Sequence, residues 1–111
     1  MPTIGKILAA GTLTDSGATT LYTVPASTIA YVTSIKIVNV GSSPRTFNIQ
    51  IKKSGGTARN YSGKDFSLAA GAKQQVLDDP QELRLGDGDI ISGDASAGTD
   101  LEFTISGVEI S

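Results

Sequence analysis

Apolar and polar residues alternate along most of this chain, and clusters of Gly, Ser, Asp and Pro separate the alternating runs. The clearest run is 46–52, in which Phe47, Ile49 and Ile51 stand between polar residues. Successive side chains of a strand point to opposite faces, so a period of two predicts a strand with one buried face. The same period recurs in 101–106, and the chain as a whole is expected to be all-β.

Seven or eight strands are expected, and no segment has the pattern of an amphipathic helix. The run 46–52 is expected to pair with the preceding strand as a hairpin, and 93–99 is expected to be a loop. Strands at hairpin-like spacing predict an antiparallel two-sheet β-sandwich of about eight strands. The predicted strands are 19–24, 29–40, 46–52, 73–77, 82–85, 89–92 and 101–106, with a short strand within 58–66.

Residues 1–17 form the least patterned segment, in which Ile4, Ile7, Leu8 and Leu13 stand among Gly, Thr and Asp. The segment fits an edge strand of the sandwich, and it also fits an arm that reaches a neighbouring subunit. We therefore divide the chain into 1–17, as arm or edge strand, and a β-sandwich domain at 18–111. Deletion of 1–17 is expected to leave the sandwich folded and to weaken partner binding.

Composition narrows the possible functions. The 111 residues suffice for one domain with a core, and the absence of Cys excludes disulfides and thiolate ligands. A net charge of −2 argues against nucleic acid, because nucleic-acid binders cluster Lys and Arg. No apolar run approaches the roughly 20 residues of a membrane span, and the first residues lack a signal-peptide pattern. We expect no membrane partner and synthesis in the cytoplasm without a signal peptide.

The residues that commonly carry chemistry are scarce. His is absent, so Ser and Thr lack their usual general base, and the Gly-x-Ser-x-Gly turn of hydrolases does not occur. The Asp-rich segment 86–89, with Asp94 nearby, is the one candidate metal site. A helix-flanked calcium loop starting at Asp87 requires a Glu at its twelfth position, which is Gly98. Asp and Gly are typical of tight turns, and the turn interpretation is preferred.

A glycosidase needs two acids that face one cleft, for which Asp78 with Asp79 or Glu102 with Glu109 are conceivable pairs. No pattern selects either pair. We therefore predict that the protein is not an enzyme and has no metal or cofactor. The glycosidase alternative requires two acids across a pocket, one of them with a raised pKa.

Five short segments together carry a family resemblance: 21–26, 32–39, 68–71, 85–89 and 105–110. In this order they resemble small virion proteins of tailed bacteriophages, and the resemblance covers residues 18–111. It implies a jelly-roll or related sandwich without catalytic residues. Among the roles of such proteins we favour capsid decoration, in which a cement or staple protein binds the outside of the shell across major capsid protein subunits.

The resemblance also implies a place on the capsid exterior and a homo-oligomer on the virion. One alternative is a tail or fibre adaptor protein. Another is a carbohydrate-binding β-sandwich module, which requires exposed aromatic residues with amides and acids at one loop end. The residues predicted to contact the capsid or another subunit are Ile4, Ile7, Leu8, Tyr22, Arg59 and Tyr61.

Overall fold

The computed structural model describes residues 4–15, 19–61, 65–77, 83–98 and 100–110. Within these ranges every strand pairing is antiparallel, and no helix is found. The strands are β1 (Ile4–Thr12), β2 (Thr19–Thr23), β3 (Ile29–Asn39), β4 (Arg45–Lys52), β5 (Arg59–Asn60), β6 (Phe66–Leu68), β7 (Lys73–Leu77), β8 (Leu83–Leu85), β9 (Ile90–Ala95) and β10 (Leu101–Ile110).

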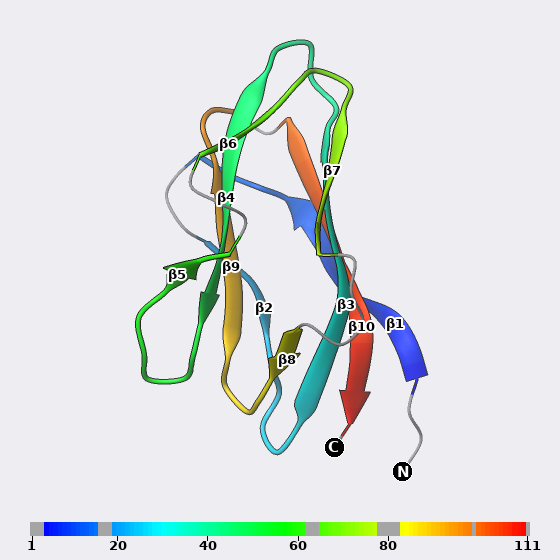
Figure 1. The fold of residues 1–111 in the computed structure, drawn as a ribbon, viewed down its shortest axis with the longest axis vertical. Coiled ribbons are helices and arrows are strands. Elements are labelled where there is room, and N and C mark those ends of the chain that lie inside the picture. Colours follow the sequence, from blue (N-terminus) through cyan, green and yellow to red (C-terminus); the bar gives the residue numbers. More distant parts are fainter. Residues whose placement is uncertain (1–3, 16–18, 62–64, 78–82, 99, 111) are drawn as a thin grey trace.

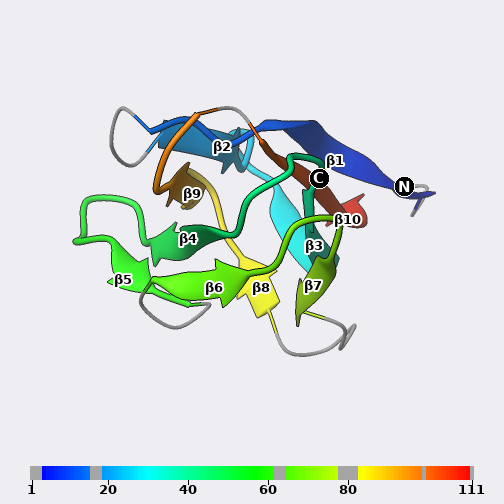
Figure 2. The same cartoon turned by 90° about the horizontal axis from the view of Figure 1, so that it is seen from above.

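The strands form two sheets that pack face to face, as Figures 1 and 2 show from two directions. Sheet A has the order β1-β10-β3, and both β7 and β8 pair with β3. Sheet B has the order β2-β9-β4, and both β5 and β6 pair with β4. The predicted two-sheet β-sandwich is confirmed. Its ten described strands occupy eight positions, because two positions are each shared by two short consecutive strands.

The pairings are nested around the middle of the chain. β1 pairs with β10, β2 with β9, β3 with β7 and β8, and β4 with β5 and β6. The chain therefore resembles one long antiparallel ribbon that has been folded over on itself. This is the strand order of a jelly roll, the double-sheet form in which two Greek keys are combined.

The predicted hairpin between 29–40 and 46–52 is wrong. β3 belongs to sheet A and β4 to sheet B, so the connection between them crosses from one sheet to the other. Both strands bury alternate apolar residues, but from opposite sides of the same core. Alternation shows which face of a strand is buried, whereas it does not identify the neighbouring strand.

Two strands are longer than predicted. β10 continues to Ile110, and β9 continues to Ala95 through part of the segment expected to be a loop. Gly93 lies in this part because the neighbouring chain is close: a Cβ there would lie 2.9 Å from the Asn48 carbonyl oxygen. Gly within a strand often marks such an approach, but sequence alone does not distinguish it from a loop.

The core lies between the inner faces of the two sheets. Ile35 and Ile37 are fully buried and Lys36 is half-exposed, as the period of two predicts. Each large apolar side chain buried here stabilises the fold by about 1.5–3 kcal/mol. The buried hydrophobic residues are Leu13, Tyr22, Val24, Ala30, Val32, Ile35, Ile37, Phe47, Ile49, Leu68, Leu85, Ile91, Ala95, Leu101, Phe103 and Ile105.

The segment that follows β1 joins the two sheets. The Leu13 N–H donates to the Leu101 carbonyl of sheet A over 2.8 Å, and the Thr14 carbonyl accepts from the Ala95 N–H of sheet B over 2.9 Å. The Leu13 side chain between these two contacts is fully buried. The structure therefore places 4–12 as an edge strand of sheet A, followed at once by a core residue.

Candidate functional site

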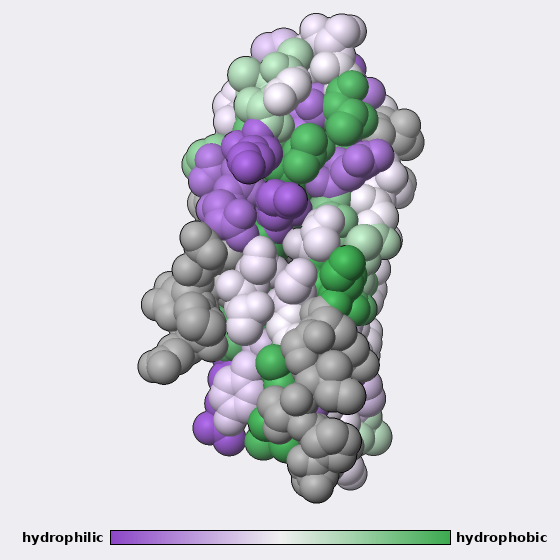
Figure 3. Space-filling model, turned by 90° about the vertical axis from the view of Figure 1, so that its right-hand side faces the viewer, coloured by the Kyte–Doolittle hydropathy of each residue, from purple (hydrophilic) through white to green (hydrophobic). Residues whose placement is uncertain are grey.

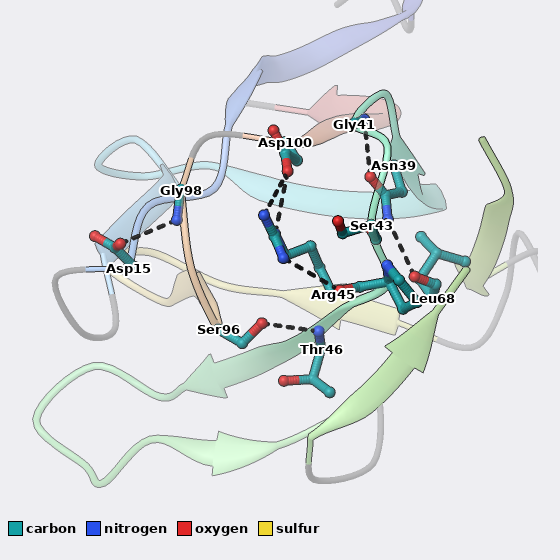
Figure 4. Close-up of polar contacts among 11 residues, drawn as sticks. Asp15, Asn39, Gly41, Ser43, Arg45, Thr46, Leu68, Ser96, Gly98 and Asp100 are labelled. Atoms are coloured by element: carbon teal, nitrogen blue, oxygen red, sulfur yellow. Dashed lines mark hydrogen bonds and ion pairs between the residues drawn. The ribbon is translucent and has the colours of Figure 1, made fainter. Parts of the chain in front are cut away.

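One loop end of the sandwich is organised by Asn39, which is fully buried (Figure 4). Its amide nitrogen donates to the carbonyl oxygens of Ser43 (2.9 Å) and Leu68 (3.1 Å), and its side-chain oxygen accepts from the Gly41 N–H (2.9 Å). A buried amide needs such partners, because an unpaired polar group is costly in a core. Asn39 thus joins the ends of β3 and β6 from within.

The same loop end carries an ion pair between Arg45 and Asp100 (Figure 4). The Arg45 Nε donates to the Asp100 carboxylate over 3.1 Å, and a second guanidinium nitrogen lies 3.0 Å from the same oxygen. Asp100 also fills the space beside Gly41, where a Cβ would lie 2.4 Å from that carboxylate. The charged groups of Arg45 and Asp100 are therefore paired with each other at this loop end.

The opposite loop end contains the Asp-rich turn. The Asp89 carboxylate accepts from the N–H groups of Ser54 (2.8 Å) and Gly86 (2.9 Å), and Asp87 accepts from the Ser27 N–H (3.1 Å). These contacts are those of Asp residues that stabilise turns. Among the described residues, no group of three or more His, Cys, Asp or Glu side chains is close enough to hold a metal ion.

The outer face of sheet B carries a network of amides and carboxylates. The Asn48 side-chain nitrogen donates to Asp94 (2.9 Å) and Asp65 (3.0 Å), and its oxygen accepts from the Asp65 N–H (2.8 Å). The Gln50 side-chain nitrogen donates to the Asn60 side-chain oxygen, and the Gln50 side-chain oxygen accepts from the Ser92 hydroxyl. The network joins its two acids, Asp65 and Asp94, through one amide.

The other predicted acid sites fall elsewhere. Asp78 and Asp79 lie outside the described residues, and Glu109 accepts a hydrogen bond from the Tyr22 hydroxyl. Glu102 lines a shallow depression of about 340 Å³ between β1 and β10, whose described lining contains no other acid. The arrangement needed for a carboxylate pair is therefore not found at Glu102 and Glu109.

The Tyr22–Glu109 contact links the two sheets, because Tyr22 lies on β2 and Glu109 on β10. Burial raises the pKa of the Tyr22 hydroxyl above its ordinary value, and the hydrogen bond to Glu109 and the negative charge of that carboxylate raise it further. Tyr22 is thus a core residue with a satisfied hydroxyl, and it is not available as an interface anchor.

The other predicted contact residues are not brought together. Ile7 is 63% exposed on β1, whereas Leu8 packs against the core. Arg59 is exposed on β5, at the edge of sheet B that is farther from β1, and Tyr61 packs against the core. For Ile4 the structure gives the backbone pairing with Glu109 but not the side chain. Of the five whose side chains the structure describes, Ile7 and Arg59 are exposed. They belong to β1 and β5, which lie on opposite sides of the sandwich in Figure 2.

The outer face of sheet A carries apolar side chains that are only partly covered. The strand registers place five of them on one half of this face, which we name the apolar surface of sheet A. Hydrophilic residues gather in the other half of the same side of the molecule, as Figure 3 shows. The apolar surface consists of Ile7, Ile29, Tyr31, Val108 and Ile110.

Tyr31 is the aromatic member of this surface. The Arg84 guanidinium lies over its ring, 5.7 Å from the ring centre. Tyr and Arg are both enriched where proteins bind other proteins. The carbohydrate alternative requires exposed aromatics at one loop end, but Tyr22 is buried and Tyr61 packs on the core.

Four members of the apolar surface escaped the sequence reasoning, which selected Ile7 alone among the five. A signal for them exists at 29–32 and 108–110, where apolar residues occupy both alternating positions of a strand. Such a strand buries one face in the core and presents the other, also apolar, to the outside. A strand with a single buried face carries part of the same pattern, so the pattern alone does not identify an exposed apolar surface.

Comparison with known proteins finds no protein family, no curated protein and no solved structure that matches this chain. In the described part of the chain there is also no helix of the length and apolarity needed to cross a membrane. The candidate site is therefore defined by its own geometry: a half-exposed apolar surface on sheet A, bordered by the edge strand β1.

Proposed function

We propose that this chain is a structural protein of a tailed-phage virion that binds the outside of the capsid shell and stabilises it. The observation that carries the proposal is the apolar surface of sheet A, which leaves large apolar side chains partly exposed on an otherwise compact sandwich. Contiguous exposed apolar residues typically mark protein interaction sites. The sequence resemblance supplies the partner, the major capsid protein.

The mechanism is binding without chemistry. Each copy docks its apolar surface against neighbouring capsid subunits, with Tyr31 and the adjacent Arg84 as the anchoring pair. Any protein that binds the assembled shell and not its dissociated parts shifts the equilibrium toward the shell. A sandwich held by one core and by closed polar networks at its ends is suited to this role, because it changes shape little on binding.

The proposal is tested by co-sedimentation of the purified protein with phage shells that lack it, with bound copies counted per shell. We expect saturable binding at a stoichiometry that matches the shell symmetry, and greater resistance of the shell to heat. Ile29→Lys, which places a charge on the apolar surface, is expected to weaken binding at least about tenfold. Thr20→Lys adds the same side chain to the exposed end of β2 and should bind as the parent does.

Two outcomes contradict the proposal. If the protein binds no shell but is recovered with purified tails, the adaptor function replaces it. If Ile29→Lys and Thr20→Lys bind the shell equally well, the apolar surface is not the docking site and the structural support for the proposal is lost. Circular dichroism of both variants serves as the control that each is folded.

A further inference from the structure

β1 is the outermost strand of sheet A: it pairs with β10, and no other described strand pairs with it, although β2 of sheet B lies near it. The Leu13 N–H donates to the Leu101 carbonyl, so Leu13 directs its backbone groups toward β10. In an antiparallel pair this direction alternates from one residue to the next. Gly11 and Ala9 therefore also face β10, whereas the N–H and C=O groups of Ala10 and Thr12 point away from it.

A β-bulge changes this spacing in the first half of the strand. The register with β10 shifts between Ile7 and Ala9, which leaves Leu8 as an extra residue. Ile7 lies opposite Ser106, and the even-numbered residues of β10 direct their backbone groups toward β3, as the Val40 N–H to Asp100 carbonyl bond shows. The backbone groups of Ile7 thus also point away from β10.

By the same alternation, the outward-pointing residues of β1 are 5, 7, 10 and 12. The interval between 7 and 10 is three residues, whereas the outward groups of a regular strand recur every two residues. A regular strand can therefore match only one half of this edge. A second copy of β1 that runs antiparallel has the same irregular interval and matches both halves.

We propose that β1 is the interface of a two-fold symmetric dimer in which the β1 strands of two copies pair antiparallel. With the two-fold axis between residues 8 and 9, Ile7 lies opposite Ala10 of the second copy, and Gly5 lies opposite Thr12. Each of these four symmetry-related pairs joins residues whose backbone groups point outward, so each exchanges two hydrogen bonds. The exposed Ile7 side chain then packs beside the small Ala10 of the second copy.

The other sheet edges are not built for such pairing. β2, β5, β6, β7 and β8 have five residues or fewer, whereas β1 has nine. Short edge strands are a common means by which proteins prevent unwanted strand addition, as are charges and Pro on the edge. Residues 7–12 of β1 contain no charged residue and no Pro. This part of the edge therefore lacks the features that prevent strand addition.

A two-fold axis perpendicular to the sheet keeps both outer faces of sheet A on the same side. The dimer therefore presents two apolar surfaces in one plane, and a shell that binds both gains by multivalency. This consequence rests on the proposed function. The dimer itself does not, because it is tested with the purified chain and without any shell.

The first test is sedimentation equilibrium at about 100 µM, far above the dissociation constant of a specific homodimer. We expect a mass near twice the 11.4 kDa of one chain. Thr12→Pro removes an N–H that points away from β10, so it should leave the fold intact and weaken dimerisation at least about tenfold. Ala10→Lys should act similarly by adding charge to the edge, and Thr104→Lys, its neighbour on β10, is the matched control.

The second test is hydrogen exchange by NMR at high and low protein concentration. The amides of Ala10 and Thr12 are expected to be protected only in the dimer, whereas those of Ala9 and Gly11 bond to β10 in either state. A monomer at about 100 µM overturns the proposal. A dimer that survives both Thr12→Pro and Ala10→Lys, or one whose Ala10 and Thr12 amides exchange freely, overturns it as well, because its interface lies elsewhere.

Discussion

The outer faces of the two sheets differ, although both sheets rest on the same core. On sheet B, Asn48, Asp65 and Asp94 bond to one another, so the polar groups of this face are partnered within the molecule. On sheet A, the side chains of Ile29 and Ile110 are half-exposed and have no such partners. The polar side chains of sheet B are therefore partnered within the molecule, whereas the proposed function requires the apolar side chains of sheet A to be covered by a binding partner.

The largest expected effect is that of deleting residues 1–17, which include β1 and the Leu13 and Thr14 backbone bonds to the two sheets. The deletion removes β1 from sheet A and Leu13 from the core. Loss of a buried Leu side chain alone costs about 2–5 kcal/mol, against a total stability of about 5–15 kcal/mol. We therefore expect the truncated chain to lose its β-sheet circular dichroism signal.

This expectation replaces the one drawn from the sequence, in which 1–17 was dispensable for folding. Leu13→Ala is the graded control and should remain folded with a lower urea midpoint. If the truncated chain folds as cooperatively as the full one, then neither β1 nor Leu13 is required for folding, and this expectation is wrong.

A charge reversal tests the comparison directly. Arg84→Glu on the outer face of sheet A is expected to weaken shell binding about a hundredfold, or about 2.7 kcal/mol, because it removes the cation from the Tyr31 ring and adds the opposite charge. Lys52→Glu makes the same change on the outer face of sheet B and should leave the affinity unchanged. Equal losses in both variants, measured by co-sedimentation, would mean that only net charge matters.

The polar network of sheet B is expected to contribute to stability and not to binding. Asn48→Ala removes the amide that joins Asp65 to Asp94 and should lower the free energy of unfolding by about 1–2 kcal/mol. The measurement is urea denaturation followed by circular dichroism, with shell binding measured in parallel. A variant of normal stability that no longer binds shells would assign the binding function to sheet B.

The smallest expected effect is that of Tyr22→Phe, which removes the hydrogen bond between the two sheets. Near pH 8 the variant should be less stable by about 1 kcal/mol. The raised pKa of Tyr22 keeps its hydroxyl protonated in the folded state above pH 10, where tyrosine of the unfolded chain ionises. The parent therefore loses stability as pH rises through this range, and the variant does so less.

Urea denaturation at pH 8 and near pH 11 checks this prediction. The stability difference between parent and variant should shrink at the higher pH, since only the parent must hold Tyr22 neutral. A difference that grows with pH would show that Glu109 does not accept this hydrogen bond in solution.

The fold could be predicted from the sequence because a strand with one buried face has apolar residues at every second position. Phe47, Ile49 and Phe103 are buried as that period requires. Strand partners could not be predicted, since β3 and β4 carry the same pattern in different sheets. The burial of Tyr22 could not be predicted either. A Tyr at the margin of a sheet and a Tyr that bonds to an acid of the opposite sheet have the same sequence pattern.

The nested pairing of the strands also sets an order for folding. Phe47 and Phe66 pair across a short stretch of chain, whereas Ile4 and Glu109 pair across almost its whole length. Closing a long loop loses more chain entropy, and chains dominated by distant pairings fold in milliseconds to seconds. Folding is therefore expected to begin near the middle of the chain, so that β1, which carries Ile7, is the last strand to join the sheet.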